Sequence, residues 1–221
     1  MRNVMEIVWY GHSCFRLSER GAATVVTDPY DKSLGLSLPR LKADVVTISH
    51  DAPDHNHVAA LRGEARVLTG PGEYEIGGVF ITGIDVRPEK KGRNKEERPR
   101  NTVFLFAFDG VTVCHLGDLA HVPSQAQVEA LGPVNVLLLP VGNAGHTLNA
   151  AQAAEVVNLL EPNIVVPMHY KTKGVELKLD PVSKFLKEMG LGEIAPQETL
   201  KVAKATLPEE TQVVILEIKG A

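Results

Sequence analysis

Cysteine is scarce in this sequence, which has only Cys14 and Cys114 among its 221 residues. Each lies inside an apolar, strand-like stretch, so we expect two buried free thiols and exclude a scaffold built on disulfides. Long hydrophobic runs are missing as well. No stretch approaches the roughly 20 apolar residues that a transmembrane helix needs, and the N-terminal stretch has no signal-peptide core. We therefore expect a cytoplasmic protein with no membrane partner.

A surplus of positive charge is also missing. The chain has 23 Lys and Arg against 27 Asp and Glu, which gives a formal net charge of -4. This balance excludes a basic surface spread over the whole molecule, so we expect no nucleic-acid partner. The hydrophobic content of 44% and the charged content of 23% are typical of globular proteins, and we predict a single domain over residues 1–221. A homo-oligomer is compatible with this composition.

One segment departs from this balance. Residues Arg87 to Asn101 include seven basic and three acidic side chains and no large apolar one. Such a run favours a long exposed loop, and phosphate binding is the alternative interpretation.

Short, β-branched segments separated by Gly, Pro or charged turns dominate the first half of the chain and predict a meandering sheet. In the second half, similar segments alternate with helical ones, which is typical of α/β architecture. The predicted strands are 4–10, 14–18, 23–28, 44–49, 65–68, 78–84, 102–108, 111–116, 134–140, 164–168 and 211–218.

Capping residues mark the expected helix starts. Ser124 with Gln127, and Asn149 with Gln152, have the capping-box spacing and predict helices over 124–131 and 149–160.

Two further helices are expected from weaker signals. Asp180 before Pro181 predicts a helix that runs to about Gly190, with the aspartate as its N-cap. The stretch "DHNHVAAL" predicts a short helix that begins at Asp54 and stops at Gly63.

Four of the predicted strands end in a histidine or an acid: His12, His50, Asp118 and His169. In layered α/β folds the loops at one edge of a sheet form the ligand-binding crevice, so these side chains can converge in space. Imidazole and carboxylate are donors that zinc and related divalent ions prefer. The sequence therefore points to a metal site, although each residue also has a structural interpretation.

The structural alternatives are specific. Asp54 could serve only as a helix N-cap, and His50 could be a core histidine bonded to a carbonyl. The neighbouring His55 shifts the balance for both toward metal binding. We expect His57 to be exposed, and His115 to lie outside the ring of direct ligands.

Seven motifs follow one another along this chain: "WYGHSCF", "TDPY", "SHDAPDH", "GPGEYEIGGV", "CHLGDLAH", "LLPVG" and "PMHYKT". Together they resemble those of the metallo-β-lactamase superfamily, within the small "metal-dependent hydrolase" group. The resemblance covers essentially the whole length and implies an αββα sandwich of the α/β (α+β) class, with a metal site along one edge.

The resemblance also implies a ligand set. His50 takes the first position of the family signature, Asp54 and His55 the paired end, Asp118 the bridging position and His169 the last. Two ligands are missing, because Ala52 stands where the second histidine belongs and no histidine occurs between His57 and His115. One of the two family metal sites is therefore depleted, while the other keeps every protein ligand.

This pattern leads to the hypothesis of a single-metal hydrolase that attacks an ester, amide or phosphoester of a small-molecule substrate by metal-activated water. Zinc is expected, one ion rather than two, with Mn, Fe or Ni as alternatives. The expected ligands are Asp54, His55, Asp118 and His169, with His50 at a vacant half-site. Asp54 or His50 is the candidate base, and His12 is a candidate for orienting the substrate or the leaving group.

Whether the chain is an enzyme stays open at this point. The alternative is a catalytically degenerate family member that binds a ligand or partner in the old cleft. An RNA-processing nuclease ranks last, because the chain is net acidic and lacks a further domain to grip a polymer.

Overall fold

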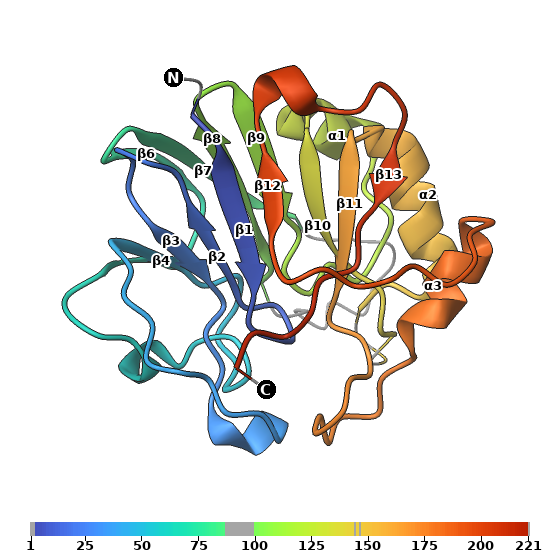
Figure 1. The fold of residues 1–221 in the computed structure, drawn as a ribbon, viewed down its shortest axis with the longest axis horizontal. Coiled ribbons are helices and arrows are strands. Elements are labelled where there is room, and N and C mark those ends of the chain that lie inside the picture. The colour runs from blue at the N-terminus through green and yellow to red at the C-terminus, as the bar shows by residue number, and fades with distance from the viewer. Residues whose placement is uncertain (1–2, 87–99, 144, 146, 221) are drawn as a thin grey trace, which may run out of the picture.

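The computed structural model describes residues 3–86, 100–143, 145 and 147–220, which form two facing β-sheets with helices outside (Figure 1). The first sheet has six strands in the order β12-β1-β2-β3-β4-β5. Their bounds are β1 Met5–Trp9, β2 Phe15–Ser18, β3 Val25–Thr27, β4 Val45–Thr47, β5 Arg66–Leu68 and β12 Leu200–Val202.

The second sheet has seven strands in the order β13-β11-β10-β9-β8-β7-β6. Their bounds are β6 Gly72–Ile76, β7 Val79–Asp85, β8 Thr102–Phe108, β9 Val111–His115, β10 Val136–Pro140, β11 Ile164–Met168 and β13 Gln212–Val213.

Strand direction brings many chain segments to one edge. In the first sheet β2 is antiparallel to both β1 and β3, and β4 is parallel to β3, so β1, β3 and β4 share a direction. In the second sheet β9, β10 and β11 are parallel to one another. Both sheets therefore contribute several strand carboxyl ends, which is where an open α/β sheet presents its functional loops.

The core lies between the two sheets, and one hydrophobic cluster joins residues of both. Alternate side chains of the first sheet point into it, among them Ile7, Phe15 and Leu17. Strands β10 and β11 are buried along their whole length because helices cover their other face.

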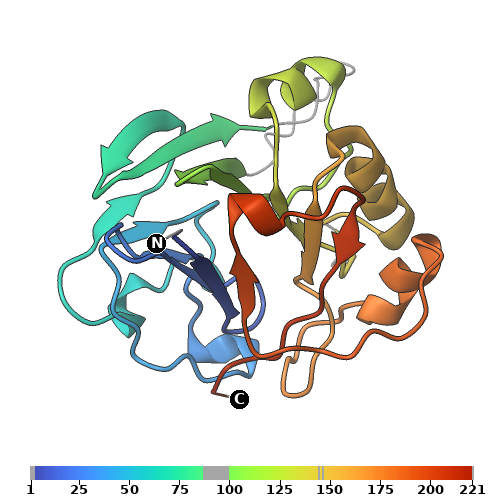
Figure 2. The ribbon, with the colours of Figure 1, turned by 45° about the horizontal axis from the view of Figure 1, so that its top comes forward.

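Three α-helices gather on the side of the seven-stranded sheet (Figure 2). They are α1 Gln125–Leu131, α2 Ala150–Leu160 and α3 Val182–Glu188. Both predicted capping boxes are confirmed, since Ser124 and Asn149 accept from the backbone N–H of Gln127 and Gln152. Those glutamines bond back to the cap backbone, so local sequence alone determines these two helix starts.

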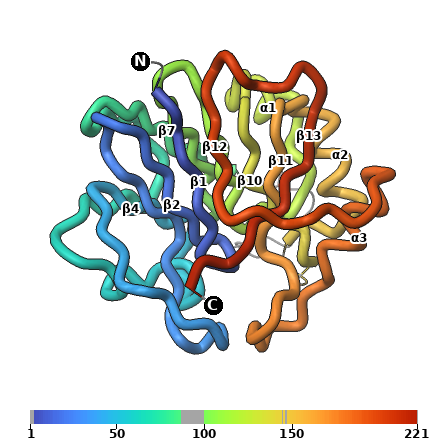
Figure 3. The backbone as a smooth tube through the Cα atoms, viewed as in Figure 1, coloured from blue at the N-terminus to red at the C-terminus, as the bar shows by residue number. Residues whose placement is uncertain are grey.

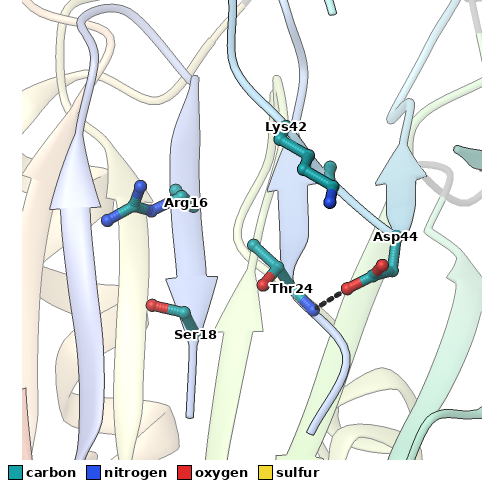
Figure 4. A pocket seen from close by; sticks show the side chains of 6 residues that line it. Arg16, Ser18, Thr24, Lys42 and Asp44 are labelled. Atoms are coloured by element: carbon teal, nitrogen blue, oxygen red, sulfur yellow. Dashed lines mark hydrogen bonds between the residues drawn. The ribbon is translucent and has the colours of Figure 1, made fainter. Parts of the chain in front are cut away.

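The outer face of the six-stranded sheet is covered differently. Val8, Val26 and Val46 point outward and pack against the segment that carries the short 3-10 helix η1 (Lys32–Leu34), including Leu34 and Leu41. A pocket of about 440 Å³ on this face is lined by Arg16, Ser18, Thr24, Lys42, Ala43 and Asp44. Figure 4 shows these side chains. Thr24, Lys42 and Asp44 precede β3 and β4, so this pocket lies toward the amino ends of those strands.

Two helix predictions are wrong in detail. Residues 54–61 do not form an α-helix: only Val58–Ala60 is helical, as a 3-10 turn (η2) without a side-chain cap. Asp54 fails to cap because its carboxylate faces His12 instead. At α3 the N-cap is Pro181, and Asp180 accepts a hydrogen bond from the Lys184 ammonium at 2.7 Å.

The sandwich architecture predicted from the resemblance is confirmed by the two facing sheets with helices outside. The tube in Figure 3 follows the chain from β1 and β2 through the second sheet and back to β12 beside β1. The predicted exposed loop at 87–101 falls mostly on residues 87–99, outside the described residues. Among the helices that the structure describes, none has the length and apolar character to cross a bilayer.

Candidate metal centre

Five strand ends supply the polar side chains of one buried cluster. His12 follows β1, Asp28 follows β3, His50 follows β4, Asp118 follows β9 and His169 follows β11. Asp54 and His55 come from the turn after His50. The convergence expected from the sequence is therefore present, and it spans both sheets.

Asp118 lies at the centre of the cluster. Its Oδ1 is 3.4 Å from His55 Nε2 and 3.2 Å from His169 Nε2. Its Oδ2 faces the other way and is 3.7 Å from His50 Nε2. The two oxygens of one carboxylate thus face two different sets of histidines.

Asp54 joins the Oδ1 side of the cluster. Its Oδ2 is 3.2 Å from His12 Nε2 and 3.7 Å from His55 Nε2. His12, Asp54, His55 and His169 each present a donor atom, and these four atoms all lie within 4.8 Å of one another. His12, His55 and His169 are at most 1% exposed, so the three imidazoles of the group are shielded from bulk water.

The Oδ2 side is sparser. His50, His55 and Asp118 form the second group of donors with mutual distances within 4.8 Å. Ala52, at the position where the resemblance implies a second histidine, has no side-chain donor atom. A pocket of about 610 Å³ opens beside His50 and is lined also by Ile48, Ser49, Asp51, Asn56, Thr69 and Arg100.

Asp28 is a site residue that the sequence interpretation missed, although it stands in the quoted "TDPY" motif. Its Oδ2 accepts a hydrogen bond from His55 Nδ1 at 2.9 Å and from Ser49 Oγ at 2.6 Å, and its Oδ1 accepts from Ser49 N. A carboxylate on Nδ1 fixes the imidazole orientation and leaves Nε2 for a ligand. The usable signal was the acid at the end of the strand-like run "ATVVTD".

Asn101 and Gly117 position Asp118. The Asn101 side chain accepts from Asp118 N at 2.9 Å and donates to Leu116 O. Gly117 has a φ of +56°, and a Cβ there would lie 2.5 Å from both Asn101 Oδ1 and Ser49 Cβ. Glycine is required for this close approach. As expected, His115 lies outside this group, where its Nε2 bonds Ser13 O at 2.9 Å.

Backbone strain is concentrated at the site. Among the described residues only five non-glycine residues have positive φ, and three of them are His12 (+52°), Asp28 (+36°) and His169 (+53°). Left-handed backbone is costly for such residues and persists where the surrounding structure enforces it, often at functional sites.

The histidines of the cluster differ in the direction in which their pKa is shifted. Burial, assisted by His169, lowers the pKa of His12 to about 3, and burial beside His55 also lowers the pKa of His50. Burial alone would lower the pKa of His55, but Asp118, Asp28 and Asp54 outweigh it and raise that pKa to about 9. Burial would raise the pKa of Asp118, but His169 and His55 hold it well below its usual range. The carboxylates are therefore charged and both His12 and His50 neutral near pH 7.

Comparison with known proteins decides the family. Residues 6–169 match the model of the β-lactamase superfamily domain. The chain belongs to the β-lactamase superfamily.

Relatives support the same assignment in this superfamily. A UPF0173 protein of Pyrococcus furiosus is 31% identical over 84% of this chain and 90% of its own length. A UPF0173 metal-dependent hydrolase of Archaeoglobus fulgidus is 28% identical over 85% of this chain and 93% of its own. A crystal structure from Thermotoga maritima, described as a Zn-dependent hydrolase of the metallo-β-lactamase superfamily, superimposes with a TM-score of 0.79, 40% identity and coverage of 96% and 98%.

The donor geometry suits a divalent ion on the Oδ1 side of Asp118. Tetrahedral zinc with bonds of about 2.0–2.1 Å separates its ligand atoms by about 3.3–3.4 Å. The separations of Asp118 Oδ1 from His55 and His169, 3.4 and 3.2 Å, match this value. His55 Nε2 is fully buried and makes no hydrogen bond to any described residue. A metal ion would satisfy that nitrogen.

Proposed function

We propose that this superfamily member is a metal-dependent hydrolase that works with a single divalent ion. Asp54, His55, Asp118 and His169 would hold the ion. The observation that carries this proposal is the spacing of Asp118 Oδ1 from two buried imidazole nitrogens. Imidazole and carboxylate donors favour zinc, with Mn, Fe or Ni as alternatives.

A bound divalent ion would supply Lewis acidity and a water of lowered pKa. The protein supplies the shape of the site and the proton carriers. His50 is neutral near pH 7, its side chain is 14% exposed, and its Nδ1 is held by Ser49 Oγ at 3.0 Å. Its Nε2 can therefore take up a proton beside the pocket that His50 lines.

Asp54 is the other candidate base, with a side chain that is 24% exposed. Its carboxylate is held by His12, and its pKa lies far below the usual range because the hydrogen bond from His12 and the charge of His55 outweigh burial. So low a pKa makes Asp54 a poor proton acceptor. We therefore assign the base role to His50 and the metal-binding role to Asp54.

The pocket beside His50 supports a small-molecule substrate. A volume of about 610 Å³ suits a small molecule, and polar side chains such as Asn56, Thr69 and Arg100 line it. We propose an ester, amide or phosphoester as the bond that is cleaved. The buried free thiols Cys14 and Cys114 fit a cytoplasmic location.

The test combines metal analysis with activity. Protein purified without a histidine tag is analysed for metals and assayed on ester, lactone, phosphodiester and lactam panels. The proposal expects metal-dependent turnover that Asp54→Asn abolishes and Asp109→Asn, at an exposed site, leaves intact. Bound metal without turnover of any substrate would contradict catalysis.

A catalytically degenerate binding protein is the second candidate. Ala52 on the Oδ2 side favours it, because a site that has lost a ligand has lost part of the family machinery. In that case ligands would bind the pocket beside His50 and Asp54→Asn would alter stability alone. Retention of all four donors on the Oδ1 side favours the enzyme.

A further inference from the structure

The turn after β1 brings a histidine to the metal centre from outside the ligand set that the resemblance implies. His12 is 1% exposed, and its Nε2 lies 3.2 Å from Asp54 Oδ2. Its ring centroid is 3.9 Å from that of His169 and 5.0 Å from that of His55. Burial beside Asp54 makes His12 a member of the cluster rather than a surface group that meets substrate.

The backbone fixes His12 in this place. Gly11 has a φ of +101° and His12 itself a φ of +52°, so the chain turns sharply here. The carbonyl of His12 accepts hydrogen bonds from Trp9 Nε1 at 3.0 Å and from His169 N at 3.1 Å. Through the second bond, the backbones of His12 and His169 are joined directly. A ligand held this rigidly loses little entropy on binding a metal.

We infer that His12 is a direct ligand of the single metal ion. Three imidazoles, from His12, His55 and His169, would then surround the ion, together with the carboxylates of Asp54 and Asp118 that the proposed function already assigns to it. This inference rests on the proposed metal-dependent function. A third imidazole, supplied from the turn after β1, would strengthen the binding of one ion at the site that keeps its other ligands.

The competing role for His12 is that of a positioning residue, whose Nε2–H only donates to Asp54. Its Nδ1 is buried and has no hydrogen-bond partner among residues 3–86, 100–143, 145 and 147–220. One ring nitrogen of His12 therefore lacks a partner in either tautomer. The two roles differ in whether Nε2 presents a lone pair or a proton toward the cluster.

X-ray absorption spectroscopy of the zinc-loaded full chain separates these roles, because it counts imidazole ligands. The wild type is expected to show about three, and His12→Asn about two. Asparagine tolerates the left-handed backbone at this position, so the variant is suited to keep the fold. His50→Asn and the exposed His57→Asn are controls that should leave the count unchanged.

Affinity alone does not separate them. Loss of a positioning residue weakens metal binding by about 10- to 100-fold, and loss of a ligand by as much or more. The imidazole count of the wild type is decisive even where His12→Asn fails to fold. About two imidazoles in the wild type, or an unchanged count in His12→Asn, would overturn the inference while leaving the proposed hydrolase intact. A wild type that binds no metal would overturn both.

Discussion

The two oxygens of Asp118 face sides of the site that have kept different amounts of the family chemistry. On the Oδ1 side lie His55 and His169, at 3.4 and 3.2 Å, and beyond them Asp54 and His12. On the Oδ2 side His50 stands at 3.7 Å, and Ala52 occupies the next expected ligand position. The Asp118 carboxylate thus belongs to a full set of expected metal ligands on its Oδ1 side, but it has only His50 as a partner on its Oδ2 side.

This difference indicates which side of Asp118 binds the metal ion and which side faces the substrate. The Oδ1 side is buried, and its histidines are fixed by Asp28 and by the backbone of His12. On the Oδ2 side, His50 also lines the pocket of about 610 Å³. We therefore expect the ion on the first side and the substrate on the second.

The largest effect is expected from breaking the Oδ1 side. His55→Gln removes a fully buried donor and should lower zinc affinity by more than about 100-fold, because it takes away a ligand and not only its support. His50→Gln should change zinc affinity by less than about tenfold. The reason is that the Oδ2 side, with one imidazole and a carboxylate shared with the other side, binds zinc too weakly to contribute to the tight site. Competition with a chelating dye measures both. An equal loss of zinc affinity in the two variants would contradict the assignment of the ion to the Oδ1 side.

A smaller effect is expected from removing the support of His55. Asp28→Asn keeps the shape of the side chain but loses the charge that faces Nδ1, and should weaken zinc binding by about 10- to 100-fold. Asp44→Asn is the matched control, since its carboxylate accepts from Thr24 N in the pocket of Figure 4. An Asp28→Asn protein with wild-type affinity would show that His55 needs no partner.

Proton competition gives the next effect. His55 must lose a proton to bind a metal, and its pKa is raised to about 9 in the metal-free site. Below that pKa, apparent zinc affinity should rise about tenfold for each unit of increasing pH, because one proton is released per ion bound. Titrations at pH 7 and pH 8 test this. A flat profile would mean that His55 is already neutral or does not bind.

The smallest effect is expected from partly restoring the Oδ2 side. Ala52→His returns one of the two missing ligands and should add a weak second binding event, detectable by calorimetry at high zinc concentration. The first, tight event should keep its affinity. If Ala52→His instead abolished tight binding, the two sides would be more closely coupled than their geometry suggests.

Local chemistry made part of this structure predictable from the sequence. The capping boxes at Ser124 and Asn149 are four-residue patterns, and both formed as expected. The convergence of His50, Asp118 and His169 followed from their positions at strand ends. The sandwich itself required the family resemblance, because periodicity alone does not determine how two sheets face each other.

Contacts between distant segments could not be read from the sequence. Asp54 looked like a helix cap, but His12, 42 residues earlier, draws its carboxylate away and no α-helix forms. Asp28 and His55 are 27 residues apart in the sequence, so their hydrogen bond could not be predicted from it. In each case a tertiary partner outweighed a local preference.

The most direct test of the single-ion account is anomalous diffraction at the zinc edge from crystals of the wild-type chain grown with zinc. One strong peak is expected, surrounded by Asp54, His55, Asp118 Oδ1 and His169. Two strong peaks about 3.5–4 Å apart, as in a two-metal hydrolase, or one peak beside His50 would contradict it.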